Sequence, residues 1–192
     1  MVISLIRHGK SEWIENNRLT CKEFIKWAEH YNRTGVYKGD HYPSETIKAL
    51  TSGEAVFTSN LKRSLESAKS LNPNINYMSS SLFREVELPQ PTINFLRIKL
   101  KPTTWAVLLR CLWLLGYSRG CESLNEARIR ANKASKCLIN YAMVYESVVL
   151  VGHGFFNLLI AKELRTTGWT GKKKPSTKHW YVTNYFYSQK DS

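Results

Sequence analysis

Two short apolar segments of the chain end in the same way, with a histidine next to glycine. Val2–Ile6 is rich in β-branched residues and stops at Arg7-His8-Gly9, while Ser147–Val151 stops at Gly152-His153-Gly154. Short apolar runs that end in glycine are typical of buried strands that lead into a loop. The pair therefore restricts the chain to folds in which two buried strands each deliver a histidine to a loop.

Strand-like and helix-like segments alternate along the rest of the chain. Apolar residues at helical spacing predict helices at Asn60–Leu71, Asn125–Tyr145 and Phe155–Leu164. Short β-rich runs predict strands at Ala55–Thr58, Ile75–Met78 and, as an edge strand, Trp180–Tyr187. This alternation predicts an α/β fold, a three-layer α/β/α sandwich with a mostly parallel central sheet.

Two segments do not fit this alternation, at about 21–40 and 91–120. Both combine aromatic and basic side chains: Trp27, Arg33, Tyr37 and Lys38 in the first, and Arg97, Lys99, Lys101 and Trp105 in the second. We expect them to be helical insertions that form a small cap over the carboxyl edge of the sheet. No linker divides the 192 residues, so we expect one domain over 1–192.

The ends of the predicted strands carry histidine, arginine and serine side chains. In an open α/β sheet, ligands bind outside the carboxyl ends of the strands, where His8 and His153 would both lie. Arg7 precedes His8, and the loop after the Ala55–Thr58 strand adds Ser59 and Arg63. One guanidinium group can bind two phosphate oxygens at once through two N–H groups. These two arginines and two histidines therefore predict a site for a tetrahedral dianion.

Charge and cysteine content narrow the class of protein. Lys and Arg outnumber Asp and Glu by 28 to 15, a net charge of +13, which favours anionic partners. The four cysteines show no metal-binding spacing, and the N-terminus lacks the pattern of a signal peptide. The apolar run Trp105–Leu115 is far shorter than the roughly 20 residues of a membrane span. We therefore expect a cytoplasmic protein without a membrane span.

Five blocks of the sequence resemble the histidine phosphatase superfamily, the phosphoglycerate mutase-like proteins. Arg7–Trp13 is similar to its RHG signature, and Phe57–Ala68 resembles its second block, with Ser59 and Arg63. The other three, in family order, are Phe83–Leu88 with an acidic residue, Cys121–Arg130 with Glu122, and Val149–Gly154 with the second histidine.

The resemblance implies a phosphatase that uses neither metal nor cofactor and acts on a small phosphorylated substrate. His8 would attack phosphorus and form a phosphohistidine, for which the imidazole has to be neutral. The cationic groups Arg7 and Arg63, with His153, would favour the neutral form and stabilise the transferring phosphoryl group. Glu85 would protonate the leaving oxygen and then activate water.

Three assignments keep an alternative. Glu85 is the closer match to the acid block, but Glu87 would lie on the same side of an extended segment. Asn17 is either a phosphate ligand or a turn-forming residue. Ser59 either donates to phosphate or caps the following helix.

Other functions remain as alternatives. A phosphoglycerate-type mutase is disfavoured because Ile14 stands where those enzymes usually carry a phosphate-contacting Asn. A basic protein that binds phosphate or nucleic acid without turnover would suit the net charge, but no nucleic-acid motif is present, so nucleic acid is not an obligatory partner. The oligomeric state is open: Trp180–Tyr187 would suit a homodimer or packing within one chain.

Overall fold

The computed structural model describes residues 1–39, 41–91 and 98–188, and its centre is a six-stranded sheet. Across the sheet the strands are β3 (Met78–Ser80), β2 (Ala55–Ser59), β4 (Ser147–Gly152), β1 (Val2–Arg7), β6 (Val182–Phe186) and β5 (Thr170–Gly171). The first four are parallel, whereas β6 runs antiparallel to β1, and β5 antiparallel to β6. The carboxyl ends of β2, β4 and β1 therefore meet at one edge.

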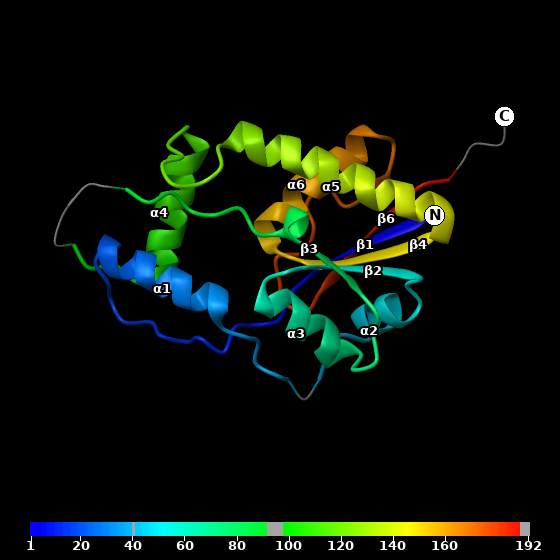
Figure 1. Cartoon of the computed structure of the whole chain (residues 1–192), viewed down its shortest axis with the longest axis horizontal. Coiled ribbons are helices and arrows are strands. Elements are labelled where there is room, and N and C mark those ends of the chain that lie inside the picture. The colour runs from blue at the N-terminus through cyan, green and yellow to red at the C-terminus, as the bar shows by residue number, and fades with distance from the viewer. Residues whose placement is uncertain (40, 92–97, 189–192) are drawn as a thin grey trace.

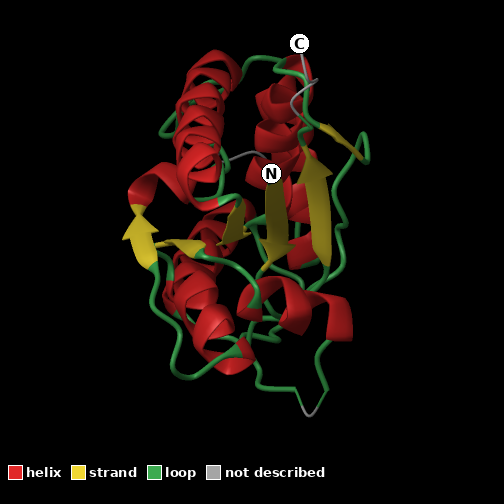
Figure 2. Ribbon diagram, turned by 90° about the vertical axis from the view of Figure 1, so that its right-hand side faces the viewer, coloured by secondary structure: helices red, strands yellow, loops and turns green. Residues whose placement is uncertain are grey.

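Helices cover both faces of the sheet. They are α1 (Cys21–Arg33), α2 (Ser44–Thr51), α3 (Lys62–Leu71), α4 (Pro102–Leu114), α5 (Leu124–Tyr145) and α6 (Gly154–Thr166), with a 3₁₀ turn, η1, at Ser81–Phe83. Figure 1 shows α5 and α6 on one side of the strands and α2 and α3 on the other, and Figure 2 shows helices on both sides of the strands. The predicted three-layer α/β/α sandwich with a mostly parallel sheet is confirmed.

Side chains of the central strands alternate between two cores. Val148 and Leu150 of β4 pack into the cluster shared with α5 and α6, whereas Val149 and Val151 pack into the cluster shared with α2 and α3. All four are fully buried. A strand buried on both faces reads as a continuous apolar run, which is why the sequence pattern of β4 was unambiguous.

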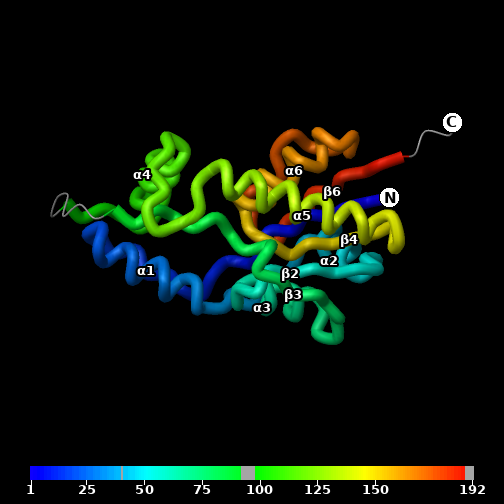
Figure 3. Tube along the Cα trace, turned by 45° about the horizontal axis from the view of Figure 1, so that its top comes forward, coloured from blue at the N-terminus to red at the C-terminus, as the bar shows by residue number. Residues whose placement is uncertain are grey.

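Both segments expected to form insertions contain a helix, α1 and α4. Figure 3 shows the two helices side by side at the end of the sheet that is remote from both termini. They share a separate apolar cluster of Cys21, Phe24, Trp105 and Leu109, and the Trp105 indole N–H donates to the Leu19 carbonyl at 2.7 Å. Asp40 and Arg97 lie outside the described residues. No helix in the described part of the chain is long and apolar enough to cross a membrane.

Three predicted elements differ from the structure. The helix expected at Asn60–Leu71 begins at Lys62, because an extended Leu61 is its N-cap. The strand expected at Ile75–Met78 is Met78–Ser80, because pairing with β2 begins only at Met78. The segment Trp180–Tyr187 is not an edge strand: its paired part, β6, lies between β1 and the short β5.

Candidate active site

The carboxyl edge of the sheet brings the two glycine-flanked histidines together. His8 follows β1 and His153 follows β4, and because these strands are parallel neighbours their rings lie 5.0 Å apart, centroid to centroid. Both are buried, His8 with 3% of its surface exposed and His153 with none. Two imidazoles withdrawn from water at one point form the centre of the candidate site.

Hydrogen bonding fixes the tautomer of His8. Its Nδ1 lies 2.7 Å from the Gly9 carbonyl oxygen, which can only accept, so Nδ1 carries the proton in the neutral ring. The lone pair is then on Nε2, which makes no hydrogen bond with the described residues. A neutral imidazole with a free Nε2 is the form that can attack phosphorus.

Ser59 is bonded to His153 and does not cap α3. The Ser59 hydroxyl accepts from the Leu61 N–H at 3.2 Å and lies 2.6 Å from His153 Nε2, to which it can donate its proton. That leaves Nδ1 of His153 as the protonated nitrogen, and it is buried without a partner. Of the two alternatives for Ser59, the helix cap is therefore wrong, and the hydroxyl is bonded to His153 instead.

Arg7 and Arg63 each keep one buried N–H unsatisfied. Arg63, with 2% of its surface exposed, donates from Nη1 to the Tyr31 carbonyl at 2.9 Å and to Asn32 Oδ1 at 3.1 Å, while Arg7 Nη1 donates to the Thr177 carbonyl. The Nε atoms of both arginines are buried without a partner. Buried donors of charged groups are normally paired, so these two are available to an anion.

The site favours neutral histidines and bound anions. Burial lowers the pKa of His8 well below its usual value, with further contributions from His153 and Arg63. Burial likewise lowers the pKa of His153, helped by Arg63 and Arg7. Among the described residues, no three His, Cys, Asp or Glu side chains are placed to hold a metal ion.

These depressed pKa values predict a loss of stability in acid. An unfolded histidine takes up its proton near pH 6.5, whereas His8 in the folded protein does so only at much lower pH. The free energy of unfolding therefore falls as pH drops below about 6.5, by about 1.4 kcal/mol per pH unit for each such histidine. In His8→Asn, whose amide can still donate to Gly9, denaturant unfolding between pH 6.5 and 5 will show a shallower dependence. An unchanged slope would contradict the neutral, buried state of His8.

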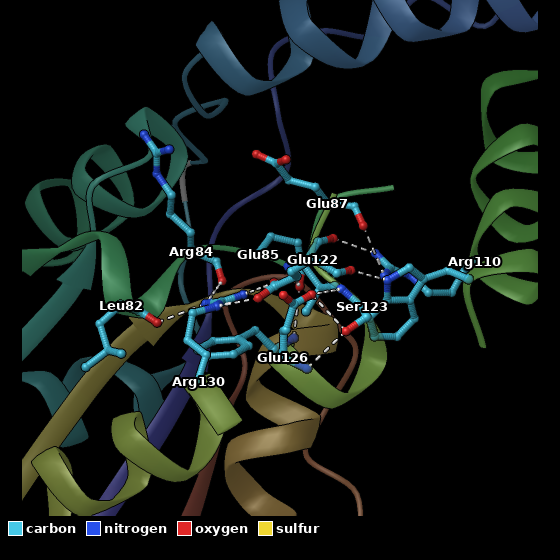
Figure 4. A network of polar contacts seen from close by, with 12 residues as sticks. Leu82, Arg84, Glu85, Glu87, Arg110, Glu122, Ser123, Glu126 and Arg130 are labelled. Carbon is cyan, nitrogen blue, oxygen red and sulfur yellow. Dashed lines mark hydrogen bonds and ion pairs between the residues drawn. The ribbon is translucent and has the colours of Figure 1, made fainter. Parts of the chain in front are cut away.

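Glu85 lies beside this centre, at the amino end of α6. Its Oε2 accepts from the Phe155 N–H at 3.1 Å, and its Oε1 accepts from the Phe156 N–H at 2.9 Å. Because α6 begins directly after His153, these bonds hold the carboxyl group next to that histidine. Glu87 is exposed, and in Figure 4 its side chain points away from the contacts that hold Glu85. Of the two acids, the structure brings Glu85 to the site.

Two arginines from helices later in the chain bind the segment that carries Glu85 (Figure 4). Arg130 of α5 donates to the carbonyl oxygens of Leu82 and Arg84, both at 2.9 Å, and forms a two-point ion pair with Glu122. On the other side, Arg110 of α4 donates to the Val86 carbonyl at 2.6 Å. The segment that carries Glu85 is thus anchored to both α5 and α4.

Asn17 is not part of this arrangement. It is exposed, and its side-chain amide donates to Glu15 Oε1 at 3.4 Å. The structure therefore favours the alternative in which Asn17 serves its own loop, and not the one in which it binds phosphate.

A third histidine, His179, lies at the same edge and was not predicted from the sequence. His179 lies three residues before the start of β6, and its ring is 5.4 Å from that of His8. The amino end of an antiparallel strand lies at the carboxyl edge of its parallel neighbours. The signal was therefore the position of His179 before an alternating strand, once that strand is known to pair antiparallel with β1.

Similarity of this chain to known proteins is found among solved structures. No protein-family model matches the sequence. No curated protein matches it either. Solved structures do: a variant of phosphoserine phosphatase from Entamoeba histolytica, in complex with phosphoserine, is 14% identical, with a TM-score of 0.54, 97% of this chain covered and 91% of that one.

Two further solved structures have a similar fold. A mycobacterial glucosyl-3-phosphoglycerate phosphatase is 15% identical, with a TM-score of 0.52 and coverage of 85% of this chain and 78% of that one. An Escherichia coli protein assigned as an alpha-ribazole-5'-P phosphatase is 16% identical, with a TM-score of 0.51 and coverage of 84% and 79%. These similarities establish the architecture: the chain has the fold of the histidine phosphatase superfamily, whose motifs its sequence resembles.

Proposed function

We propose that this protein is a metal-independent phosphatase that hydrolyses a phosphomonoester through a phosphohistidine on His8. The observation that carries the proposal is a set of three unsatisfied buried nitrogens, Nε of Arg7, Nε of Arg63 and Nδ1 of His153. They belong to side chains at one sheet edge, around a neutral His8. A phosphate dianion would supply the acceptors that these N–H groups lack.

The proposed reaction has two steps. His8 Nε2 attacks phosphorus, the phosphorus–oxygen ester bond breaks, and Glu85 in its acid form gives its proton to the leaving oxygen. Water then attacks the phosphohistidine, returns a proton to Glu85 and releases inorganic phosphate. Arg7, Arg63 and His153 would stabilise the charge on the equatorial phosphoryl oxygens in both steps.

The comparisons support the substrate class. The similar structures include a phosphoserine phosphatase and a glucosyl-3-phosphoglycerate phosphatase, by name enzymes for small phosphomonoesters. The cationic site and the net charge of +13 both suit a small anionic substrate. We propose in addition that residues 1–192 form one domain, that 21–40 and 91–120 act as its cap, and that the protein works in the cytoplasm.

Phosphate release from a panel of phosphomonoesters tests this function. The panel contains p-nitrophenyl phosphate and alkyl phosphates such as phosphoserine, each with and without excess EDTA. We expect turnover that EDTA does not reduce, because fixed arginine charge does the work of a metal and would repel a cation. A loss of activity in EDTA that added metal restores would contradict the mechanism. Activity confined to moving phosphate between two hydroxyls would favour a mutase.

A further inference from the structure

We propose that His179 is a third histidine of the phosphate site and that its Nε2 binds an oxygen of the phosphoryl group, on the side of His8 opposite His153. This inference rests on the function proposed above. It assigns a role to a residue outside every sequence motif that predicts the site.

The order of the strands places His8 between two histidines. Strand β1 lies between β4 and β6, and each of these three strands has a histidine at the same edge of the sheet. The His8 ring is 5.0 Å from that of His153 on one side and 5.4 Å from that of His179 on the other. A phosphoryl group on His8 would therefore have an imidazole on each flank.

Residues 177–181, here called the strap, tie His179 to the loop after β1. His179 Nδ1 lies 2.9 Å from the His8 carbonyl oxygen, so Nδ1 carries a proton and donates it to that oxygen. The Thr177 carbonyl accepts from Arg7 Nη1. Nε2 of His179 has no partner among the described residues and, unlike the buried unpaired atoms, is not fully enclosed. It is the free end of a ring whose other end is anchored.

The strap is held in a conformation that an unconstrained chain would avoid. Trp180 has φ +69°, in the left-handed region that a bulky residue rarely adopts. Its N–H donates to the Arg7 carbonyl at 3.0 Å and its carbonyl accepts from Thr46 Oγ1 at 2.7 Å. Its indole packs so closely on Gly9 that a Cβ there would lie 2.0 Å from the ring. Strain retained by this many contacts is typical of functional segments.

The charges around His179 explain how it would respond to phosphate. Burial lowers the pKa of His179, and the cations Arg7, Lys10 and Arg63 lower it further, against the bond to the His8 carbonyl, which raises it. His8 itself faces the ring. A bound dianion would offset this repulsion, so the ring would gain a proton on Nε2 and donate it to a phosphoryl oxygen.

Two substitutions separate phosphate binding by Nε2 of His179 from the bond of Nδ1 to the His8 carbonyl. The amide nitrogen of His179→Asn can take the place of Nδ1 and keep the bond to the His8 carbonyl, but nothing replaces Nε2. His179→Gln places its amide near Nε2 and gives up the bond to His8. We expect His179→Asn to weaken inorganic phosphate binding, measured by titration calorimetry, by about tenfold or more, as for a lost hydrogen bond to a charged group. His179→Gln should lose less.

Sulfate gives a second readout, because this tetrahedral dianion does not itself titrate between pH 5.5 and 8. The wild-type protein should take up protons when it binds sulfate, and His179→Asn should take up fewer. Equal phosphate affinity and equal proton uptake in His179→Asn and wild type would overturn the inference. The inference would also be overturned if only His179→Gln bound phosphate weakly and its Tm were lower. His179 would then have a purely structural role through its bond to the His8 carbonyl. If wild type and Arg63→Ala both fail to bind phosphate, the proposed function itself is wrong.

Discussion

Replacing His8 by alanine should lower phosphate release by at least about a thousandfold for every substrate that the wild-type protein hydrolyses. The reason is that Nε2 of His8 is the proposed attacking atom. Nε2 of His153 is bonded to Ser59, and Nε2 of His179 is proposed above to bind a phosphoryl oxygen and not to attack phosphorus. Steady-state phosphate release, followed with p-nitrophenyl phosphate and phosphoserine, measures the loss.

The matched control for this variant is His41→Ala, which removes an exposed histidine outside the site. It should leave phosphate release unchanged. Because His8 is buried, the alanine variant also needs a check that it still folds, and a retained cooperative unfolding transition provides one. Substantial turnover by a folded His8→Ala protein would remove the phosphohistidine mechanism.

Glu85→Gln should separate substrates by their leaving groups. An alkyl alcohol leaves as a strong base and needs the proton that Glu85 would supply, whereas p-nitrophenolate leaves without one. We therefore expect kcat/KM to fall by about 10²- to 10⁴-fold for an alkyl phosphate. The fall for p-nitrophenyl phosphate should be much smaller, because kcat/KM reports on steps up to departure of the leaving group.

Glu87→Gln is the control for this prediction, since Glu87 lies two residues away but is exposed and points away from the site. It should leave both substrates unaffected. An equal loss for both substrates in Glu85→Gln would mean that Glu85 supports the α6 terminus and does not supply the proton. A selective loss in Glu87→Gln would assign the proton donor to Glu87.

The sequence was sufficient to predict the centre of the site because the centre lies at strand ends. A strand buried on both faces appears in the sequence as a continuous apolar run. Strands β1 and β4 give two such runs, which end just before His8 and His153. The carboxyl ends of parallel strands share one edge, so adjacency of the two histidines follows from fold class alone. The same reasoning predicted that Arg63, about one helical turn beyond the end of β2, lies at this edge.

The rest of the site depends on long-range contacts that no local pattern records. Arg130 reaches the carbonyl oxygens of Leu82 and Arg84 across 46 or more residues, and His179 reaches the backbone of His8 across 171. Local pattern also left Ser59 as either a phosphate donor or a helix cap, whereas its hydroxyl is bonded to His153, 94 residues away. Capping preference is a weak local tendency, and a buried imidazole that needs a partner outweighs it.

The most direct test of the central claim is to trap the covalent intermediate. The protein is mixed with ³²P-labelled phosphoserine, quenched within the first turnovers in alkali, digested and mapped, because a phosphohistidine survives alkali but not acid. We predict alkali-stable label on the peptide that contains His8, and none in His8→Ala. Hydrolysis by the wild-type protein without any label on that peptide, or with label on another residue, would contradict the mechanism.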